Sequence, residues 1–538
     1  MQLDFGRLTL LLSVVWLASG LIGHQPWKAD EAYSTGLVYS IAQGGSWVVP
    51  TLAGEPFMEK PPAFYLVAAG FGTLFSRWLL FHDAARLAAG WFTALTLVCV
   101  AWAARSWSGN GSAAVLALVA CIGLAVHAHV LITDVGLLSG FALAYLGFAL
   151  YSSSRPQLAA LTLGNGVGLG FMTKGLLEPG IVGLIVIALP MVFAQWRSAR
   201  YLRFALLSAA WALPWIVIWP ALLWRASPEL FMQWFWTNNF GRFFGFAGLG
   251  PQAPSWAYLR ILPWFALPAL PFAAFVCWKQ RFALRHSPML QVCVTGFLAT
   301  LIVLSASHDA RALYAMPLLP PLAVLAAGVS TTLSSRANAW MFASASVVYA
   351  AVAVLVWMAW LALHTGWPQP LALWLQREQP AFVPSFEAVN LTLAVLMTAA
   401  WMASLYRVRR DTHAMLFAWA AGLTLIWGLC TTLLLGWVDT GKSYRAMFDD
   451  VARNLPSPLT CLATKNLGEP QRALVHYYLH TLPRRTEREA TGPCNALLIQ
   501  VRLVDTRQLP APGEEWVPRW EGARPGDEKE KFWLYSRR

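Results

Sequence analysis

The sequence predicts an all-α polytopic membrane protein that carries a small soluble α/β domain at its C-terminal end. Hydrophobic residues make up 57% of the 538 residues and charged residues only 12%, with a mean hydropathy of +0.52, whereas soluble domains carry about 25% charged residues. The charges are unevenly spread: residues 1–436 contain 13 acidic and 23 basic side chains, while residues 437–538 contain 13 and 16. We therefore expect a membrane region over 1–436 and a soluble domain over 437–538.

Fourteen apolar runs in the membrane region approach the roughly 20 residues that a helix needs to span a bilayer. The first run, 8–23, is interpreted as a transmembrane helix and not as a signal peptide, because it lacks a clear small-residue cleavage site and many more runs follow. The other runs lie at 63–80, 84–104, 112–131, 135–151, 159–173, 176–195, 204–223, 256–278, 289–305, 313–330, 339–363, 389–406 and 414–436.

Three short basic segments predict the orientation, because short loops rich in Lys and Arg belong in the cytoplasm. They lie at 197–203, 279–285 and 407–410. We count the crossings forward from Met1 and backward from the first basic segment. The two counts agree only if 63–104 crosses once, so one of its two apolar pieces must be short, re-entrant or interfacial. About thirteen spans then remain, with loop 24–62 and the C-terminal domain outside. The same rule explains the net charge of +13, and we expect no nucleic-acid partner because no basic patch is interleaved with exposed aromatic residues.

The first outer loop, 24–62, carries two candidate chemical groups. The acidic pair Asp30-Glu31 opens a predicted amphipathic helix over 32–43 on the membrane surface, and either carboxylate could simply cap that helix. Lys60 precedes Pro61-Pro62 where the chain re-enters the membrane. A lysine beside the positive end of a helix dipole favours a bound anion such as a phosphate, although it could also reach the interface as an anchor.

Further outer turns add charged residues of both signs. Asp134 follows the fourth apolar run and either caps the next helix or faces outward, and Lys174 follows two runs later. Arg242 lies between aromatic residues in the predicted outer loop 224–255, where it could clamp a phosphate or pack on a ring. Arg311 and Tyr314 belong to another outer turn. The outer face is therefore where chemistry that needs carboxylates and cations is expected.

The order and spacing of these motifs resemble a known family. A Tyr-x-x-Pro-x-x-Pro segment begins at Tyr314, and residues 439–445 read DTGKSYR. Together with Asp30-Glu31, Glu59-Lys60, Thr173-Lys174-Gly175 and Arg242-Phe243-Phe244-Gly245, they resemble the bacterial 4-amino-4-deoxy-L-arabinose lipid A transferases. Those enzymes belong to the broader protein-mannosyltransferase-like group with the GT-C fold. The likeness covers nearly the whole chain and depends on no single motif.

The resemblance implies an inverting integral membrane glycosyltransferase of the bacterial inner membrane, with its site and C-terminal domain in the periplasm. It would move a sugar, an aminoarabinose-like pentose, from a polyprenyl-phosphate carrier to lipid A. It implies that Asp30 activates or orients the acceptor, with Glu31 and Asp134 as the other candidates for the base. It implies donor-phosphate contacts at Lys60 and Arg242. Further cations and cavity-lining residues would be Arg311, Lys174, Glu59, Tyr33 and Tyr314.

The sequence departs from the family pattern at one position. The family typically has an arginine and a tyrosine shortly after the acidic pair, and Tyr33 and Ser34 stand there in this chain. Arg242 and Arg311 are the candidates to replace that arginine. No cofactor is expected with certainty. A divalent metal could be held by Asp30 and Asp134, but lysine and arginine can neutralise a single phosphate without one.

Two alternative functions stay open. A transferase of the same fold could use a protein or another glycan as acceptor. A transporter or flippase of lipid-linked sugars is the competing class, but the chain shows no internal repeat and its charges lie at the outer interface and not at mid-membrane.

In the C-terminal domain, Cys461 and Cys494 could pair if the domain is outside the cytoplasm. We expect strands at 496–503 and 532–535 and helices at 444–455 and 470–479.

Overall fold

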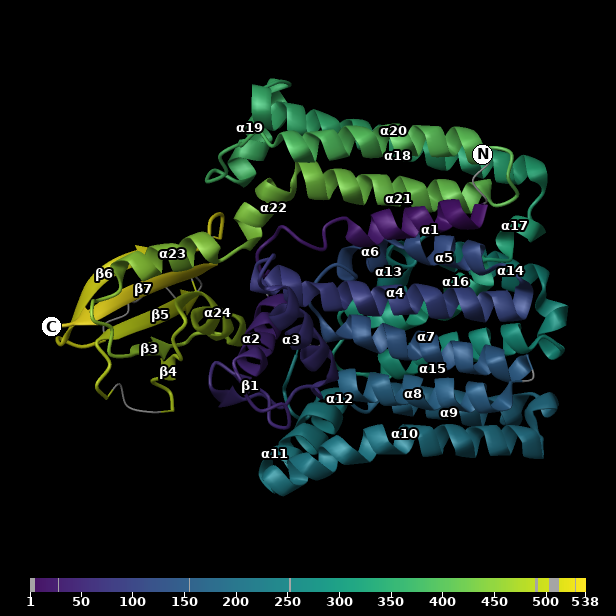
Figure 1. Cartoon of the computed structure of the whole chain (residues 1–538), viewed down its shortest axis with the longest axis horizontal. Coiled ribbons are helices and arrows are strands. Elements are labelled where there is room, and N and C mark those ends of the chain that lie inside the picture. The colour runs from purple at the N-terminus through teal and green to yellow at the C-terminus, as the bar shows by residue number, and fades with distance from the viewer. Residues whose placement is uncertain are drawn as a thin grey trace.

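A bundle of long helices and a small mixed sheet occupy opposite ends of the long axis in the computed structural model (Figure 1). The structure describes residues 5–27, 29–153, 155–250, 253–488, 492–502, 512–527 and 529–538. The prediction of a helical membrane protein with a small C-terminal sheet is confirmed.

Eight helical segments in these described ranges are long and apolar enough to cross a membrane. Two further helices, α13 (Ala257–Phe265) and α14 (Ala269–Lys279), are bent by 96° relative to each other and make a ninth span if they are counted together. The eight are α4 (Phe81–Ser108), α7 (Thr133–Ser152), α10 (Ala199–Ala226), α15 (Pro288–Ala306), the segment Ala312–Thr332, α18 (Ser335–Thr365), α20 (Ala388–Val408) and α21 (Ala414–Leu433).

The predicted count of about thirteen spans is not confirmed, because several apolar runs form shorter or broken helices. Run 112–131 forms two short helices, α5 (Gly111–Val119) and α6 (Ile122–His127). The segment Ala312–Thr332 is itself divided into η4 (Ala312–Leu318), α16 (Leu319–Ala326) and α17 (Val329–Thr332). The shorter apolar helices are α1 (Phe5–Ala18), α3 (Ala63–Phe75) and α9 (Leu177–Val192), and α8 (Pro156–Lys174) packs between α7 and α10.

The length of helix α3 supports the prediction that 63–104 crosses the membrane once. Its 13 residues rise about 20 Å at 1.5 Å per residue, less than the roughly 30 Å of a hydrocarbon core. Helix α4 has 28 residues and is long enough to cross. The expectation that one of the two pieces is short is therefore confirmed.

Helix α2 (Asp30–Ala42) is the predicted first-loop helix, but most of its side chains are buried inside the protein. It packs against α3 and against α24 (Glu469–Leu479) of the C-terminal domain. The backbones approach closely, since a Cβ at Gly36 would lie 2.6 Å from the Cβ of Ala473. The prediction of an amphipathic helix was wrong because α24 packs against α2 and leaves it without an exposed polar face.

The predicted loop 224–255 connects α10 to α13, and its first part is helical. It contains α11 (Pro228–Met232), the π-helix η2 (Gln233–Gly241) and α12 (Arg242–Phe244). Residues 251 and 252 lie outside the described residues. π-Helical turns are rare and are frequently found at functional sites, and here η2 leads directly into Arg242.

The C-terminal segment folds as a five-stranded sheet with helices beside it. The strand order is β4-β3-β5-β7-β6, in which β3 runs parallel to β4 and β5 while β7 runs antiparallel to β5 and β6. A disulfide joins Cys461 to Cys494, the pairing that the sequence left open. The elements are α22 (Leu435–Lys442), α23 (Arg445–Asn454), β3 (Leu462–Lys465), α24, β4 (Arg484–Arg485), β5 (Ala496–Arg502), β6 (Trp516–Gly522) and β7 (Glu530–Arg537).

The four elements predicted in the tail are confirmed, although Leu503 at the end of one predicted strand lies outside the described residues. Two small elements of the first loop also approach this end of the molecule: β1 (Thr51–Leu52) and β2 (Glu55–Pro56) form a hairpin. Short 3-10 helices at the other end are η1 (Ala194–Trp196) and η3 (Arg281–Arg285).

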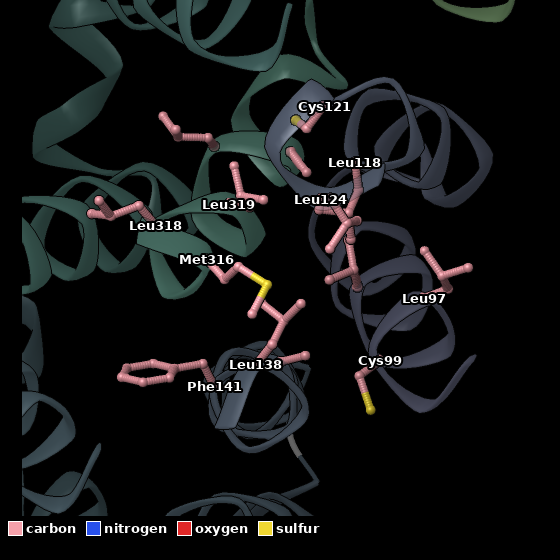
Figure 2. Close-up of a cluster of buried hydrophobic side chains, with 14 of the residues drawn as sticks. Leu97, Cys99, Leu118, Cys121, Leu124, Leu138, Phe141, Met316, Leu318 and Leu319 are labelled. Atoms are coloured by element: carbon pink, nitrogen blue, oxygen red, sulfur yellow. The ribbon is translucent and has the colours of Figure 1, made fainter. Parts of the chain in front are cut away.

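The largest apolar core holds the elements that later supply the site. Figure 2 shows Met316 of η4 against Leu138 of α7, with Leu97 of α4 and Leu118 of α5 on the facing helices. All four side chains are buried. Because Asp134 begins α7 and Tyr314 lies in η4, the same packing that excludes lipid from the core also positions these two polar residues.

Candidate active site

A small polar cavity of about 130 Å³ lies where α2, the end of the first loop, α12, η4 and α24 meet. It brings together residues from five separate parts of the chain. The lining residues are Ala29, Asp30, Tyr33, Glu59, Lys60, Arg242, Arg311, Tyr314, Glu469 and Pro470. Seven of the predicted site residues are therefore neighbours: Asp30, Tyr33, Glu59, Lys60, Arg242, Arg311 and Tyr314.

A larger cavity of about 490 Å³ adjoins the polar cavity and shares Glu59, Lys60, Arg242 and Tyr314 with it. We call it the apolar cavity, because most of its remaining wall is hydrophobic. That wall consists of Leu176, Leu177, Pro179, Phe240, Phe243, Phe244, Val303 and Leu304, together with Gly180, Lys174, Asn238, Asn239, Ser307 and Asp309. The pair of cavities suits a molecule with a charged head and an apolar tail.

Asp30, Tyr33 and Lys60 form one hydrogen-bonded chain at the bottom of the polar cavity. Asp30 and Tyr33 lie on one face of α2 because they are three residues apart, and the Tyr33 hydroxyl donates to Asp30 Oδ1 at 2.7 Å. The Lys60 ammonium donates to the same Tyr33 oxygen and is buried. A buried ammonium without a carboxylate in direct contact favours an additional anion.

The charge of Asp30 is stabilised from several directions. Burial alone would raise the pKa of Asp30. Lys60, the Tyr33 hydroxyl and Arg311 together outweigh burial, so this pKa lies below the ordinary value of 3.8. The Arg311 Nη1 lies 3.5 Å from Asp30 Oδ1, a loose ion pair. Asp30 is therefore a carboxylate at neutral pH, able to accept a hydrogen bond or to face a developing positive charge.

Two further ion pairs border the cavities. Glu59 accepts two hydrogen bonds from Arg242, at 2.7 and 3.4 Å, in the bidentate geometry that suits a guanidinium. Asp134, at the start of α7, pairs with Lys174 at the end of α8. The Lys174 ammonium also lies 4.1 Å from the ring centre of Tyr314. These pairs link α12, α7, α8 and η4 around the site.

Glu31 does not belong to the cavity. Its carboxylate points the other way and pairs with Arg86 of α4 at 2.7 Å. It also accepts the backbone N–H groups of Trp27 and Leu131. Burial raises the pKa of Glu31, but Arg86 and His24 outweigh it and the pKa is lowered overall. A saturated carboxylate of this kind holds helices together and does not reach a substrate.

Two residues that the sequence interpretation missed also belong here. Asp309 pairs loosely with Arg311 at 3.7 Å and accepts the Tyr314 hydroxyl at 3.4 Å. Glu469 comes from the first turn of α24, and burial together with the charge of Glu59 raises its pKa. No sequence signal relates position 469 to position 30, because only the docking of the C-terminal domain brings them together. Asp309 could have been found by its proximity to Arg311 in the sequence.

No described group of three or more His, Cys, Asp and Glu side chains could hold a metal ion. Asp30 and Asp134, the predicted pair for a divalent cation, each have a cationic partner instead: Arg311 for Asp30 and Lys174 for Asp134. These residues therefore do not fit a metal site in the arrangement that the structure describes.

No family model matches the chain. The chain is 26% identical over 424 residues to the undecaprenyl phosphate-alpha-4-amino-4-deoxy-L-arabinose arabinosyl transferase of Yersinia enterocolitica, which covers 76% of this chain and 72% of the relative. The enzyme of the same name from Pectobacterium carotovorum is 29% identical over 360 residues, 62% of each chain.

Two solved structures share the fold. The crystal structure of ArnT from Cupriavidus metallidurans bound to undecaprenyl phosphate matches with a TM-score of 0.74 and 19% identity, over 98% of this chain and 97% of that one. The archaeal oligosaccharyltransferase AglB from Archaeoglobus fulgidus matches with a TM-score of 0.52 and 10% identity, over 92% and 69%. The chain is therefore a multi-pass membrane protein that has the fold of ArnT and is similar in sequence to the bacterial aminoarabinose transferases that the motif order predicted.

Proposed function

We propose that this chain transfers 4-amino-4-deoxy-L-arabinose from undecaprenyl phosphate to lipid A at the periplasmic face of the bacterial inner membrane. The curated relatives are named for this sugar and this carrier. The observation that carries the proposal is the pair of adjoining cavities: the polar one is lined by cations and carboxylates, and the apolar one is walled by aliphatic and aromatic side chains. A sugar linked through phosphate to a polyprenyl chain has the same division of polarity.

The donor phosphate would lie where the two cavities meet. Lys60 and Arg242 line both, and Lys60 has only a tyrosine hydroxyl as a hydrogen-bond partner in the described residues. Fixed positive charge stabilises a phosphate as it leaves. Arg311 is close to Asp30 in the polar cavity, which supports it as the replacement for the arginine that the family has near position 33.

The carboxylates of the polar cavity support an amino sugar. Glu59 and Glu469 both line it, and a protonated amine on the sugar would be attracted to them. Burial and the neighbouring Glu59 charge raise the pKa of Glu469, and a protonated amine beside it would favour its ionised form. A neutral hexose would offer these two carboxylates no positive charge.

The reaction is an inverting displacement at the anomeric carbon. An oxygen of the acceptor forms the new C–O bond while the bond to the carrier phosphate breaks, and undecaprenyl phosphate leaves with the electron pair. A phosphate oxygen of lipid A is already deprotonated at neutral pH, because its second pKa is about 6. Asp30 would then orient the acceptor or stabilise the positive charge on the sugar ring, whereas for a hydroxyl acceptor it would have to take up the proton.

The proposed orientation follows from the basic segments and the position of the sheet domain. In Figure 1 the C-terminal domain lies at one end of the bundle and the N-terminus at the other. Segments 197–203, 279–285 and 407–410 adjoin the start of α10, the end of α14 and the end of α20, and α10 runs from the N-terminal end toward α11 near the site. The positive-inside rule would then place the site and residues 437–538 in the periplasm.

Lipid A mass spectrometry in cells that produce either the native chain or Asp30→Asn tests the proposal. We expect a pentosamine-sized increment on lipid A with the native chain and its loss with Asp30→Asn. Asp449→Asn is the matched control, because Asp449 pairs with Arg445 on the surface of α23, so it should keep the increment. Unmodified lipid A with a correctly inserted native chain would contradict the proposal and favour a protein or glycan acceptor.

A further inference from the structure

Three arginines of the C-terminal domain converge on a single carboxylate of the first loop. Glu55 Oε2 lies 2.8 Å from Arg472, 3.1 Å from Arg485 and 3.4 Å from Arg488. We call these four residues the arginine cluster. Arg472 belongs to α24 and Arg485 to β4. Glu55 belongs to the β1-β2 hairpin, five positions before Lys60.

The described charges of the arginine cluster do not balance. Among the described residues, the other carboxylate that contacts it is Glu487, whose Oε2 lies 3.7 Å from Arg485 and whose Oε1 accepts the backbone N–H of Asn466. Two carboxylates therefore face three guanidinium groups in this part of the structure. The side chain of Arg472 is only 8% exposed, and its Nε has no hydrogen-bond partner in the described part of the chain. A buried guanidinium with an unmade hydrogen bond is costly, so an additional anion would stabilise it.

A cavity of about 720 Å³ lies beside the arginine cluster. Arg485 is the member of the arginine cluster that lines it, and the other polar lining residues are Asn466, Gln471, Glu487, Gln500, Arg502 and Glu530. Pro470 lines both this cavity and the polar cavity that contains Asp30. Helix α24 connects the two sites directly, because Glu469 lines the polar cavity and Arg472, one turn later, belongs to the arginine cluster. The guanidinium groups of Arg485 and Arg502 can bind a phosphate in this cavity, and its amide and carboxylate groups can bind sugar hydroxyls.

We propose that the arginine cluster and this cavity bind the non-reacting phosphate of the acceptor glycolipid; this inference rests on the proposed function and deepens it. Lipid A carries two phosphates on a disaccharide. One must reach the polar cavity to accept the sugar, and the other then needs a cationic site a short distance away. The arginine cluster provides that site on the domain that covers the polar cavity, while the donor phosphate stays with Lys60 on the membrane side.

Glu55 occupies the arginines when no acceptor is bound, and an acceptor phosphate competes with it. This assigns opposite effects to two substitutions in one cluster. Arg485→Gln and Arg488→Gln remove attraction for the phosphate, so the KM for the acceptor rises. Glu55→Gln removes the competing carboxylate, so the KM for the acceptor falls. A cluster that served only to attach the C-terminal domain to the first loop would respond in the same direction to all three.

The experiment measures transfer by the purified full-length chain in lipid nanodiscs, with bisphosphorylated and monophosphorylated lipid A as acceptors. We expect Arg485→Gln and Arg488→Gln to raise the acceptor KM for the bisphosphorylated form about tenfold each and leave the donor KM unchanged. Neither variant should change the KM for monophosphorylated lipid A. Glu55→Gln should lower the KM for bisphosphorylated lipid A. Arg453→Gln, an exposed arginine paired with Asp450 on α23, is the matched control and should keep native kinetics.

The outcomes separate the two proposals. If the native chain transfers no sugar to either acceptor, the proposed function is wrong. If the native chain is active but the arginine variants keep the native acceptor KM, or if Glu55→Gln raises it, the inference is overturned while the function stands. Direct binding of bisphosphorylated lipid A to donor-free nanodiscs, weakened by Arg488→Gln, is the second readout. Arg488 is 60% exposed, so this variant is expected to fold.

Discussion

Asp30 and Glu31 are adjacent in the sequence, yet their carboxylates lie in opposite environments. Asp30 faces the polar cavity with a hydroxyl donor at 2.7 Å and an arginine at 3.5 Å. Glu31 faces the helix bundle, where Arg86 lies 2.7 Å away and two backbone N–H groups complete its hydrogen bonds. Arg86 in turn pairs with Asp83 at 2.6 Å and donates to two backbone carbonyls.

The first turn of α2 therefore has two roles: Glu31 stabilises the fold and Asp30 faces the polar cavity. Around Glu31 every charge has a close partner of opposite sign, so nothing is left to bind a ligand. Around Asp30 the cations Lys60 and Arg311 are held at some distance or through a hydroxyl, so they remain able to bind an anion. The Glu31 network attaches α2 to α4 and thereby fixes the direction in which Asp30 points.

The largest expected effect comes from breaking the Glu31 network. Arg86→Gln leaves two buried carboxylates without their cation, and removing one partner of a buried pair costs about 3–5 kcal/mol. We expect a large drop in the thermal unfolding midpoint of the purified protein in detergent. Arg453→Gln, on the exposed surface, should leave that midpoint unchanged. An unchanged midpoint for Arg86→Gln would show that the network does not stabilise the fold.

The same network gives stability a pH dependence. The pKa of Glu31 is lower in the folded chain than the ordinary 4.5, so its contribution is fully present above that value and is lost as the pH falls through the folded pKa. Glu31→Gln should remove this acid-dependent part of the stability, which thermal unfolding at a series of pH values would reveal.

Asp30→Asn should show the reverse pattern, with little change in stability and a large loss of activity. We expect kcat to fall about 10²–10⁴-fold, the usual contribution of a group that acts directly on the reacting atoms. The unfolding midpoint should stay near the native value, because Asp30 is partly solvated and loosely paired. The combination is measured by single-turnover transfer and thermal unfolding on the same preparation. Equal stability losses for Asp30→Asn and Arg86→Gln would remove the distinction between the two regions.

Lys60 is expected to control the acid limb of the activity profile. It is the main group that lowers the pKa of Asp30 below 3.8. Lys60→Gln removes that charge while burial continues to favour the neutral acid, so the pKa of Asp30 rises. The residual activity of Lys60→Gln should therefore decline at a higher pH than native activity does. Profiles of kcat/KM against pH check this, and coincident acid limbs would contradict it.

Tyr33→Phe tests the hydroxyl that links Asp30 to Lys60 and has the smallest expected effect. It removes one hydrogen bond to each partner and keeps the ring that packs near Phe57. We expect kcat/KM to fall about tenfold with an unchanged unfolding midpoint. Tyr39→Phe is the control, because the Tyr39 hydroxyl lies in the same helix but contacts His480. Similar losses for both variants would show that Tyr33 has no special link to the site.

Much of the site could be predicted because its residues occur in a recognisable order along the chain. Asp30, Lys60, Arg242 and Tyr314 all line one cavity, although more than 280 positions separate the first from the last. The sequence could not distinguish Asp30 from Glu31, since both open the same helix. The burial of α2 was also missed, because its hydrophobic pattern says nothing of a domain that begins four hundred residues later.

Composition and charge distribution by themselves determined that the chain is a helical membrane protein with a charged C-terminal domain, because apolar length and the placement of Lys and Arg are properties of local sequence. Only the contacts in the folded chain show which carboxylate faces the polar cavity, that Glu469 lines the same cavity, and that Cys461 pairs with Cys494. The physical reason is that burial and ion pairing depend on contacts between distant segments. Such contacts leave no periodic signal in the residues that make them.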